Sequence, residues 1–121
     1  MKCRAALATV ALALPVSLLA VTAVLAADLR VGATAQVKAN SMWFEVAAQL
    51  AAWQQVKRRA DAKVLAGYES KVTQARQAWR FLDPLSVKIL AYDKARHHVK
   101  VEQLTAGRLQ GSTWYVDASA F

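Results

Sequence analysis

The stretch LSVKILAYDKARHHVKVE, residues 85–102, decides the fold that the sequence predicts. Apolar side chains recur there at every second position, first from Leu85 to Ala91 and again from His98 to Glu102. A period of two is typical of β-strands, because successive side chains point to opposite faces of a sheet. The polar run YDKAR between the two halves is typical of a turn. We therefore predict a β-hairpin in this part of the chain.

Two further segments are expected to extend the hairpin into an antiparallel sheet. Residues 109–116 follow a turn in which Gly107 is free to adopt a positive φ angle. Residues 29–38 alternate in part between apolar and polar side chains. Four apolar side chains of that segment share one face: Val31, Ala33, Ala35 and Val37. The sequence thus predicts one strand before residue 40 and another after residue 108.

The apolar spacing changes to three and four in residues 42–59, which predicts a helix. Asn40 or Ser41 is the expected N-cap, because a short side-chain oxygen can accept from free N–H groups of the first turn. The apolar face of this helix is expected to contain Trp43, Val46, Ala47, Leu50 and Trp53.

A second helix is predicted over residues 61–82, with Asp61 as its N-cap. Its long apolar stripe includes Trp79, which we therefore expect in the core. Pro84 should end the helix, because the residue before a proline is displaced from helical geometry. The short connection between the two helices predicts an antiparallel helical hairpin.

The end of the chain carries the run GSTWYVDASAF, residues 111–121, after the two strands VKIL and HVKV and the turn at Gly107. This pattern resembles the later strands of bacterial SH3-like domains, in which an aromatic-Val strand end leads into a short 3₁₀ turn. The resemblance implies an α+β fold: a small antiparallel SH3-like sheet or barrel, with the helical hairpin inserted at about residues 42–82. It implies a fold and not a ligand.

The sequence departs from that family where proline-rich peptides would bind. SH3 domains of that kind need a proline at the start of the final 3₁₀ turn and a tyrosine near its end, where this chain has Asp117 and Ala120. The resemblance therefore does not imply that proline-rich peptides are ligands.

Residues 1–26 have the three parts of a secretory signal peptide. Lys2 and Arg4 give a positive start, an uncharged Ala-, Leu- and Val-rich run follows, and small residues precede the expected cleavage after Ala26. The alternative is an uncleaved membrane anchor, since about 20 apolar residues suffice to span a bilayer. We expect an exported protein, periplasmic or extracellular, whose mature domain comprises residues 27–121. Cleavage would also remove the single cysteine, Cys3.

Removal of the first 26 of the 121 residues would leave 95, enough for one domain with a modest core. The formal net charge would fall from +8 to +6, because Lys2 and Arg4 are lost and no acidic residue is. A positive domain favours anionic partners such as acidic proteins, acidic polysaccharides or phosphate head groups. The alternative is that the charge only maintains solubility.

Catalytic and metal-binding chemistry is not expected from the motifs. His97 and His98 are adjacent on a predicted strand and would point to opposite faces, which disfavours joint metal binding. The mature chain has no cysteine, and its acidic residues are isolated in sequence. Asp61, Asp83 and Asp93 each fit a cap or turn. We expect no cofactor, no metal and no enzymatic activity.

Aromatic and basic residues of the first predicted helix are the candidate binding residues. Trp43 and Trp53 are ten positions apart, nearly on one side of a helix, and precede the basic run Lys57-Arg58-Arg59. Such an aromatic face could bind a partner protein or a sugar. The structural alternative is that both tryptophans only pack the helix onto the sheet. Trp114, like Trp79, is expected to be structural.

These observations favour a non-enzymatic binding protein of the bacterial envelope that contacts another protein. The first alternative is a basic module that binds anionic cell-wall polymer or lipid. A third is a hydrolase whose site is not visible in the sequence. Nucleic acid would fit the charge, but the export signal argues against it.

Overall fold

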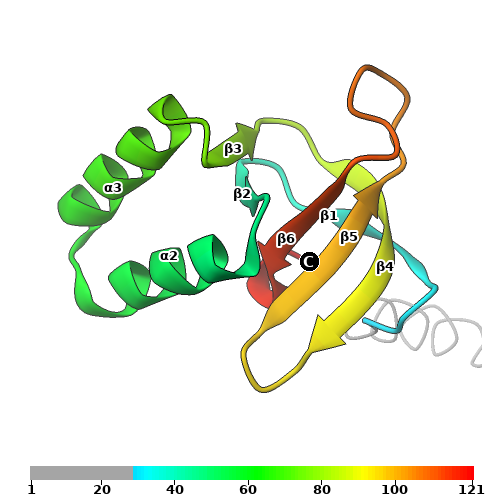
Figure 1. Ribbon diagram of the computed structural model, residues 1–121, viewed down its shortest axis with the longest axis horizontal. Coiled ribbons are helices and arrows are strands. Elements are labelled where there is room, and N and C mark those ends of the chain that lie inside the picture. Colours follow the sequence, from blue (N-terminus) through cyan, green and yellow to red (C-terminus); the bar gives the residue numbers. More distant parts are fainter. Residues whose placement is uncertain (1–28) are drawn as a thin grey trace, which may run out of the picture.

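The computed structural model describes residues 29–121, so the predicted signal peptide lies outside the described residues. Within that part of the chain the fold is α+β: two helices and a six-stranded antiparallel sheet (Figure 1). Between residues 29 and 121 no helix is long and apolar enough to cross a membrane.

The central strands are those that the period-two pattern predicted. β4 (Leu85–Asp93) pairs antiparallel with β5 (His98–Gln103), which pairs with β6 (Thr113–Asp117). β6 begins later than residue 109, because residues 104–112 form a long loop. β1 (Thr34–Val37) pairs with β4, and a 3₁₀ turn, η2 (Ala118–Ala120), follows β6. The full strand order is β1-β4-β5-β6-β2-β3.

The prediction that the first helix starts at Met42 is wrong, because Ser41–Phe44 forms strand β2. Trp43 points into the interior of the curled sheet, whereas Met42 and Phe44 point to the opposite face and pack beneath the helices. Both faces of β2 are thus buried, and a strand buried on both faces has a continuous apolar run in place of alternation. The apolar run of residues 42–44 is therefore also compatible with a helix, which is why the sequence pattern did not predict β2.

Helix α2 (Ala47–Arg59) begins five residues later than predicted, with Val46 at the N-cap position and no side-chain cap. Asn40 and Ser41 therefore do not cap it. Asn40 instead has φ 62° in the turn that precedes β2. This left-handed conformation is one that asparagine tolerates better than most residues.

Helix α3 (Ala62–Gln74) begins as predicted, with the Asp61 carboxylate accepting from the Val64 N–H at 2.9 Å. It ends earlier than predicted, so its extension to Leu82 is wrong. Arg76 has φ 60°, and the N–H groups of Arg76 and Gln77 return to the carbonyls of Thr73 and Val72. This is a Schellman ending, which usually carries glycine in place of arginine.

Strand β3 (Ala78–Phe81) follows that ending and pairs with β2 at the edge of the sheet. The expectation of a helical Trp79 in the core is wrong. Trp79 lies on β3 opposite Trp43, and its side chain is 39 % exposed.

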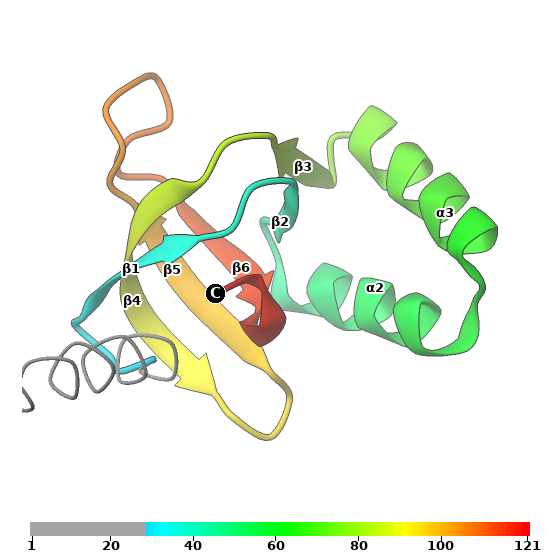
Figure 2. The same ribbon diagram turned by 180° about the vertical axis from the view of Figure 1, so that it is seen from behind.

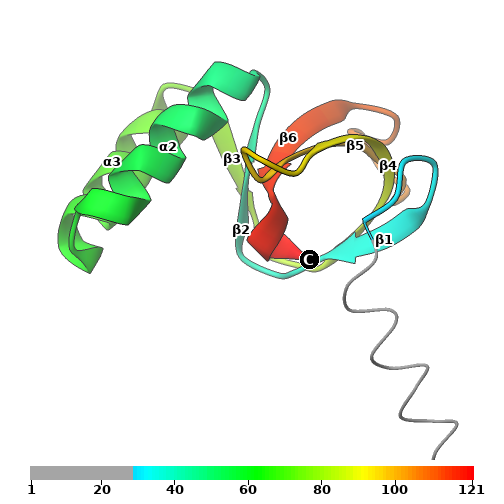
Figure 3. The ribbon, with the colours of Figure 1, turned by 90° about the horizontal axis from the view of Figure 1, so that it is seen from below.

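Two separate cores lie on the two faces of β2 and β3. Figure 3 shows the sheet curled on one side of these strands and the helices packed on the other. The first core fills the curled sheet and consists of Val37, Trp43, Val87, Ile89, Val99, Val101, Trp114 and Val116. The second joins the helices to the sheet and consists of Met42, Phe44, Leu50, Trp53, Val72 and Ala78.

Candidate functional site

Gln54 attaches α2 to the sheet where β6 ends. Figure 2 shows α2 beginning beside the end of β6. Its amide nitrogen donates to Asp117 Oδ1 at 2.5 Å and to the carbonyls of Arg96 and His97 at 3.2 and 3.4 Å. Its amide oxygen lies 2.8 Å from His98 Nε2. Because that oxygen can only accept, His98 Nε2 must carry the proton. Gln54 thereby fixes the helix against the turn that joins β4 to β5.

The pKa values of Asp117 and His98 are both lower than their ordinary values in this network. Burial lowers the pKa of His98, because the charged imidazolium loses hydration. Burial alone would raise the pKa of Asp117, but hydrogen bonds from Ser119 and Gln54, with Lys57 nearby, hold it below its usual range. Asp117 is therefore a carboxylate, and His98 is neutral, at neutral pH.

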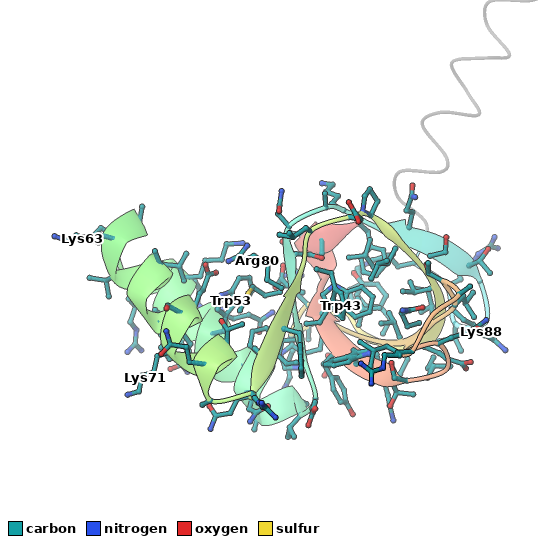
Figure 4. The ribbon with its side chains drawn as sticks, turned by 90° about the horizontal axis from the view of Figure 1, so that it is seen from above. Trp43, Trp53, Lys63, Lys71, Arg80 and Lys88 are labelled. Carbon is teal, nitrogen blue, oxygen red and sulfur yellow. The ribbon has the colours of Figure 1, made fainter. Side chains whose placement is uncertain are left out.

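Glu69 joins both helices to the edge of the sheet. One carboxylate oxygen accepts from Trp53 Nε1 at 2.7 Å, and the other accepts from Arg80 Nη2 at 2.6 Å. Arg80 also donates to the carbonyl of Asn40 at 2.8 Å. Figure 4 shows Trp53 and Arg80 between the helices and the sheet. The charge of Glu69 is thus engaged inside the protein.

A surface depression runs from the β1–β2 turn across η2 to α2. It consists of two hollows of about 240 and 330 Å³, which are contiguous because both are lined by Lys57, Asp117 and Ser119. We call it the basic trough and define it by six residues: Lys38, Trp53, Lys57, Arg58, Asp117 and Ser119.

Cations flank both ends of the basic trough. Lys57 Nζ lies 4.9 Å from the centre of the Trp53 ring, a cation–π distance. Lys38 Nζ donates to the Ser119 carbonyl at 3.5 Å. Arg58 lines the second hollow. Lys57 and Arg58 also lie in the last turn of α2, where positive charge stabilises the helix dipole. This role explains part of their position without any ligand.

The predicted binding residues separate into three places. Trp53, Lys57 and Arg58 meet in the basic trough. Arg59 lies outside it, in a groove between the helices. Trp43 is fully buried in the sheet core, where Trp114 also lies, as expected, and its indole N–H donates to Ser41 Oγ at 2.8 Å. It therefore cannot form part of the trough surface.

Sequence reasoning missed Lys38, Gln54, Asp117 and Ser119 as neighbours of the predicted residues. They come from the β1–β2 turn, α2, β6 and η2 respectively. Only the folded arrangement of these segments places the four residues near one another. One signal was present: Asp117-Ala118-Ser119 has the spacing of an Asx turn, in which the Ser119 N–H donates to Asp117 at 2.9 Å.

The trough offers positive charge and hydrogen-bonding groups to a ligand, whereas Trp53 lies mostly beneath its surface. Ser119 Oγ donates to Asp117 and not to a histidine, so this serine is arranged as a turn residue and not as an activated nucleophile. No three His, Cys, Asp or Glu side chains within residues 29–121 are placed to hold a metal ion together.

No protein-family model matches the chain, and neither a curated protein nor a solved structure is detectably similar to it.

Proposed function

We propose that the chain is an exported, non-enzymatic binding protein of the bacterial envelope that holds an acidic segment of another protein in the basic trough. The observation that carries the proposal is the convergence of Lys38, Lys57 and Arg58 around Trp53 and η2. Trp53 itself is only 7 % exposed, so the cations around it supply most of the surface that a ligand could contact.

The charge balance of the trough supports an acidic ligand. Its two hollows contain two acidic residues, Glu69 and Asp117, and both already accept hydrogen bonds from the protein's own side chains. The same hollows are lined by four basic residues, Lys38, Lys57, Arg58 and Arg80, so their net charge is +2 and would attract an anion from outside. Such an attraction would also steer the partner and raise the association rate.

The proposal includes an SH3-like fold for the domain. The antiparallel succession β4-β5-β6, the 3₁₀ turn after β6 and the placement of both helices between β2 and β3 support it. In this arrangement the helices and η2 form opposite walls of the trough. Fold likeness does not identify a ligand, so the proposed function rests on the trough itself.

Affinity capture from envelope extract tests the proposal. Protein carrying Lys57→Gln and Arg58→Gln should retain less than about a tenth of the partner that the unchanged protein retains, because both charges border the trough. The matched control is Lys88→Gln with Arg108→Gln, one lysine and one arginine exposed on β4 and in the β5–β6 loop. Equal loss in both variants would show that net charge alone matters and would reject the trough.

The alternative function, binding of anionic wall polymer or lipid, is favoured by one observation. Residues 47–76 contain six basic and two acidic side chains, so they carry a net charge of +4 out of the +6 of residues 27–121. Binding to phosphatidylglycerol vesicles or acidic polysaccharide would fade between low and high salt. Capture of a protein partner in the trough should weaken less over the same change, because ion pairs that an interface buries are screened less than exposed ones.

Export is tested by N-terminal sequencing of protein recovered from the envelope. We expect the chain to start at Ala27 or Asp28, after the small-residue site. An intact Met1 would instead support the uncleaved anchor.

A further inference from the structure

The two adjacent histidines at the end of the β4–β5 turn are divided between the interior and the surface. The His98 side chain is buried and lies against Gln54. The His97 side chain is exposed and lines the second hollow of the basic trough, together with Lys57 and Arg58. His97 thus borders the proposed ligand site, whereas His98 supports the helix behind it.

Three segments hold the backbone of His97 in place. Its N–H donates to the Lys94 carbonyl at 3.4 Å, which closes the turn. Its own carbonyl accepts from the Ala118 N–H at 2.9 Å and from the Gln54 amide at 3.4 Å. The turn, η2 and α2 therefore fix His97 at the rim of the trough.

His97 has φ 58°, a left-handed conformation for which glycine is the usual residue at this place in a hairpin turn. Within residues 29–121 two other non-glycine residues have a positive φ, Asn40 and Arg76. Asn40 lines the first hollow of the trough, so each hollow contains one such residue. Backbone strain of this kind clusters at ligand sites. It directs attention to a role for the imidazole that glycine could not supply.

A proton on His97 would double the net charge of the second hollow. With His97 neutral, the hollow contains two cations, Lys57 and Arg58, and one anion, Asp117, which gives a net charge of +1. Protonation of the ring raises that charge to +2. Histidine is the side chain that changes charge between about pH 5 and pH 8. The attraction for an acidic segment should therefore grow as the pH falls through this range.

We propose that His97 is a ligand-binding residue of the basic trough, and that its protonated ring donates a hydrogen bond to a carboxylate of the acidic segment. This inference rests on the proposed function of the trough and adds that the partner is held more tightly at mildly acidic pH. A hydrogen bond between two charged groups is roughly twice as strong as a neutral one.

The other charged groups around His97 do not reproduce this pH dependence. Aspartate, lysine and arginine ordinarily titrate outside the range from about pH 5 to pH 8. The charged or titratable neighbours come from every element that meets the turn: Lys57 and Arg58 on α2, Asp117 at the end of β6, Asp93 at the end of β4, Lys94 and Arg96 in the turn, and His98 on β5.

Fluorescence anisotropy with an acidic probe at two pH values tests the inference. The probe is a labelled peptide of about eight residues in which aspartate alternates with glycine, and it stays ionised because aspartate ordinarily titrates near about pH 4. At low ionic strength we expect protein purified from the envelope to bind it about three- to fivefold more tightly at about pH 5.5 than at about pH 8. Equal affinity at both pH values overturns the role of His97 and leaves the proposed function standing. Absence of binding at either pH rejects the trough as an acidic-ligand site, and this inference with it.

Three variants assign the pH dependence to a side chain. His97→Gly should abolish it without lowering the melting temperature, because glycine adopts φ 58° at no side-chain cost. His97→Lys should bind at about pH 8 as tightly as the unchanged protein does at about pH 5.5, because lysine is charged at both values. The matched control is Arg76→Gly, which relieves the same backbone conformation and removes a cation from an exposed position after α3. It should keep the full pH dependence.

His98 is the competing source of pH dependence, and it predicts the opposite sign. Burial lowers the pKa of His98, so its ring gains a proton only at a lower pH than an exposed histidine does. A charged ring there favours hydration over the contact with Gln54, which would weaken the wall of the trough and the binding in acid. Tighter binding at about pH 8 than at about pH 5.5, or a pH dependence that persists in His97→Gly, therefore overturns the proposal.

Discussion

Trp43 and Trp79 face each other across β2 and β3, yet their environments differ completely. Trp43 is fully buried and packs edge-on against Phe81 and Trp114, with ring centres 4.8 and 6.1 Å apart. Trp79 contacts Trp114 at 6.3 Å and exposes 39 % of its surface at the sheet edge. Trp53 resembles Trp43 in burial, because both helices cover it and its N–H is bonded to Glu69.

Alanine substitution should therefore affect the three tryptophans unequally. Trp43→Ala and Trp53→Ala should each lower the free energy of unfolding by about 3–5 kcal/mol, since each leaves a buried cavity. Trp79→Ala should cost about 1–2 kcal/mol, because less apolar area is lost from the interior. Urea unfolding followed by circular dichroism measures all three. A larger loss for Trp79→Ala than for Trp53→Ala would contradict the two cores described here.

Asp117 makes stability depend on pH in a defined direction. Its pKa is lowered in the folded state, so its contribution is complete above the unfolded value, 3.8, and is lost as the pH falls below that value. The lowered pKa of His98 acts with the same sign at higher pH, because unfolding lets the ring bind a proton.

Asp117→Asn should reduce the urea midpoint at about pH 7 and change it less at about pH 2.5, which lies below the unfolded pKa of 3.8, where the contribution of the charged form declines. Asp83→Asn, in the exposed bend before Pro84, is the control and should change little at either pH. An equal loss at both pH values would mean that the Asp117 charge contributes nothing to the attachment of α2.

At the scale of elements, the period of the sequence was informative only where one face of the element is exposed. β4 and β5 alternate and were predicted correctly. β2 was not, because the helices bury Met42 and Phe44 on the face opposite Trp43, and no local pattern reveals a second core. The end of α3 was also missed, since Arg76 adopts the left-handed conformation without a glycine to indicate it.

Gly67 offers a test of α3 as an element. It lies in the middle of the helix, and a Cβ atom there would meet nothing within 4 Å. Gly67→Ala should raise the free energy of unfolding by about 0.5–1 kcal/mol, because alanine loses less backbone entropy in a helix. Gly107→Ala should destabilise the protein, since φ there is 145°. Thermal melts of both variants show whether each change raises or lowers stability. Destabilisation by Gly67→Ala would show that position 67 is not a solvent-facing position in the middle of a helix.

At the scale of the whole molecule, the sequence pointed to three of the six residues that define the trough but not to the trough itself. Trp53, Lys57 and Arg58 were chosen because they are close in sequence, and they do lie together. Trp43 was included on the assumption of one continuous helix, and the strand places it in the other core. Asp117 lies 63 residues from Gln54 in the sequence, and the two residues come into contact only in the folded chain.

The basic residues of the domain lie on several different surfaces. Figure 4 shows Lys63 and Lys71 on the outer side of α3 and Lys88 on the far side of the sheet, all away from Trp53. The cations of the trough instead converge on η2, where the two hollows meet. The central claim is therefore that a partner contacts this side of the molecule and not the charged surface in general.

Photo-crosslinking in the envelope tests that claim most directly. A photoreactive amino acid in place of Ala39, exposed at the first hollow, is compared with one in place of Ala106, exposed in the β5–β6 loop. We predict one adduct of defined mass from position 39 and none from position 106, and the adduct should be lost with Lys57→Gln and Arg58→Gln. Equal adducts at both positions, or an adduct at position 39 that persists without the two charges, would contradict the account.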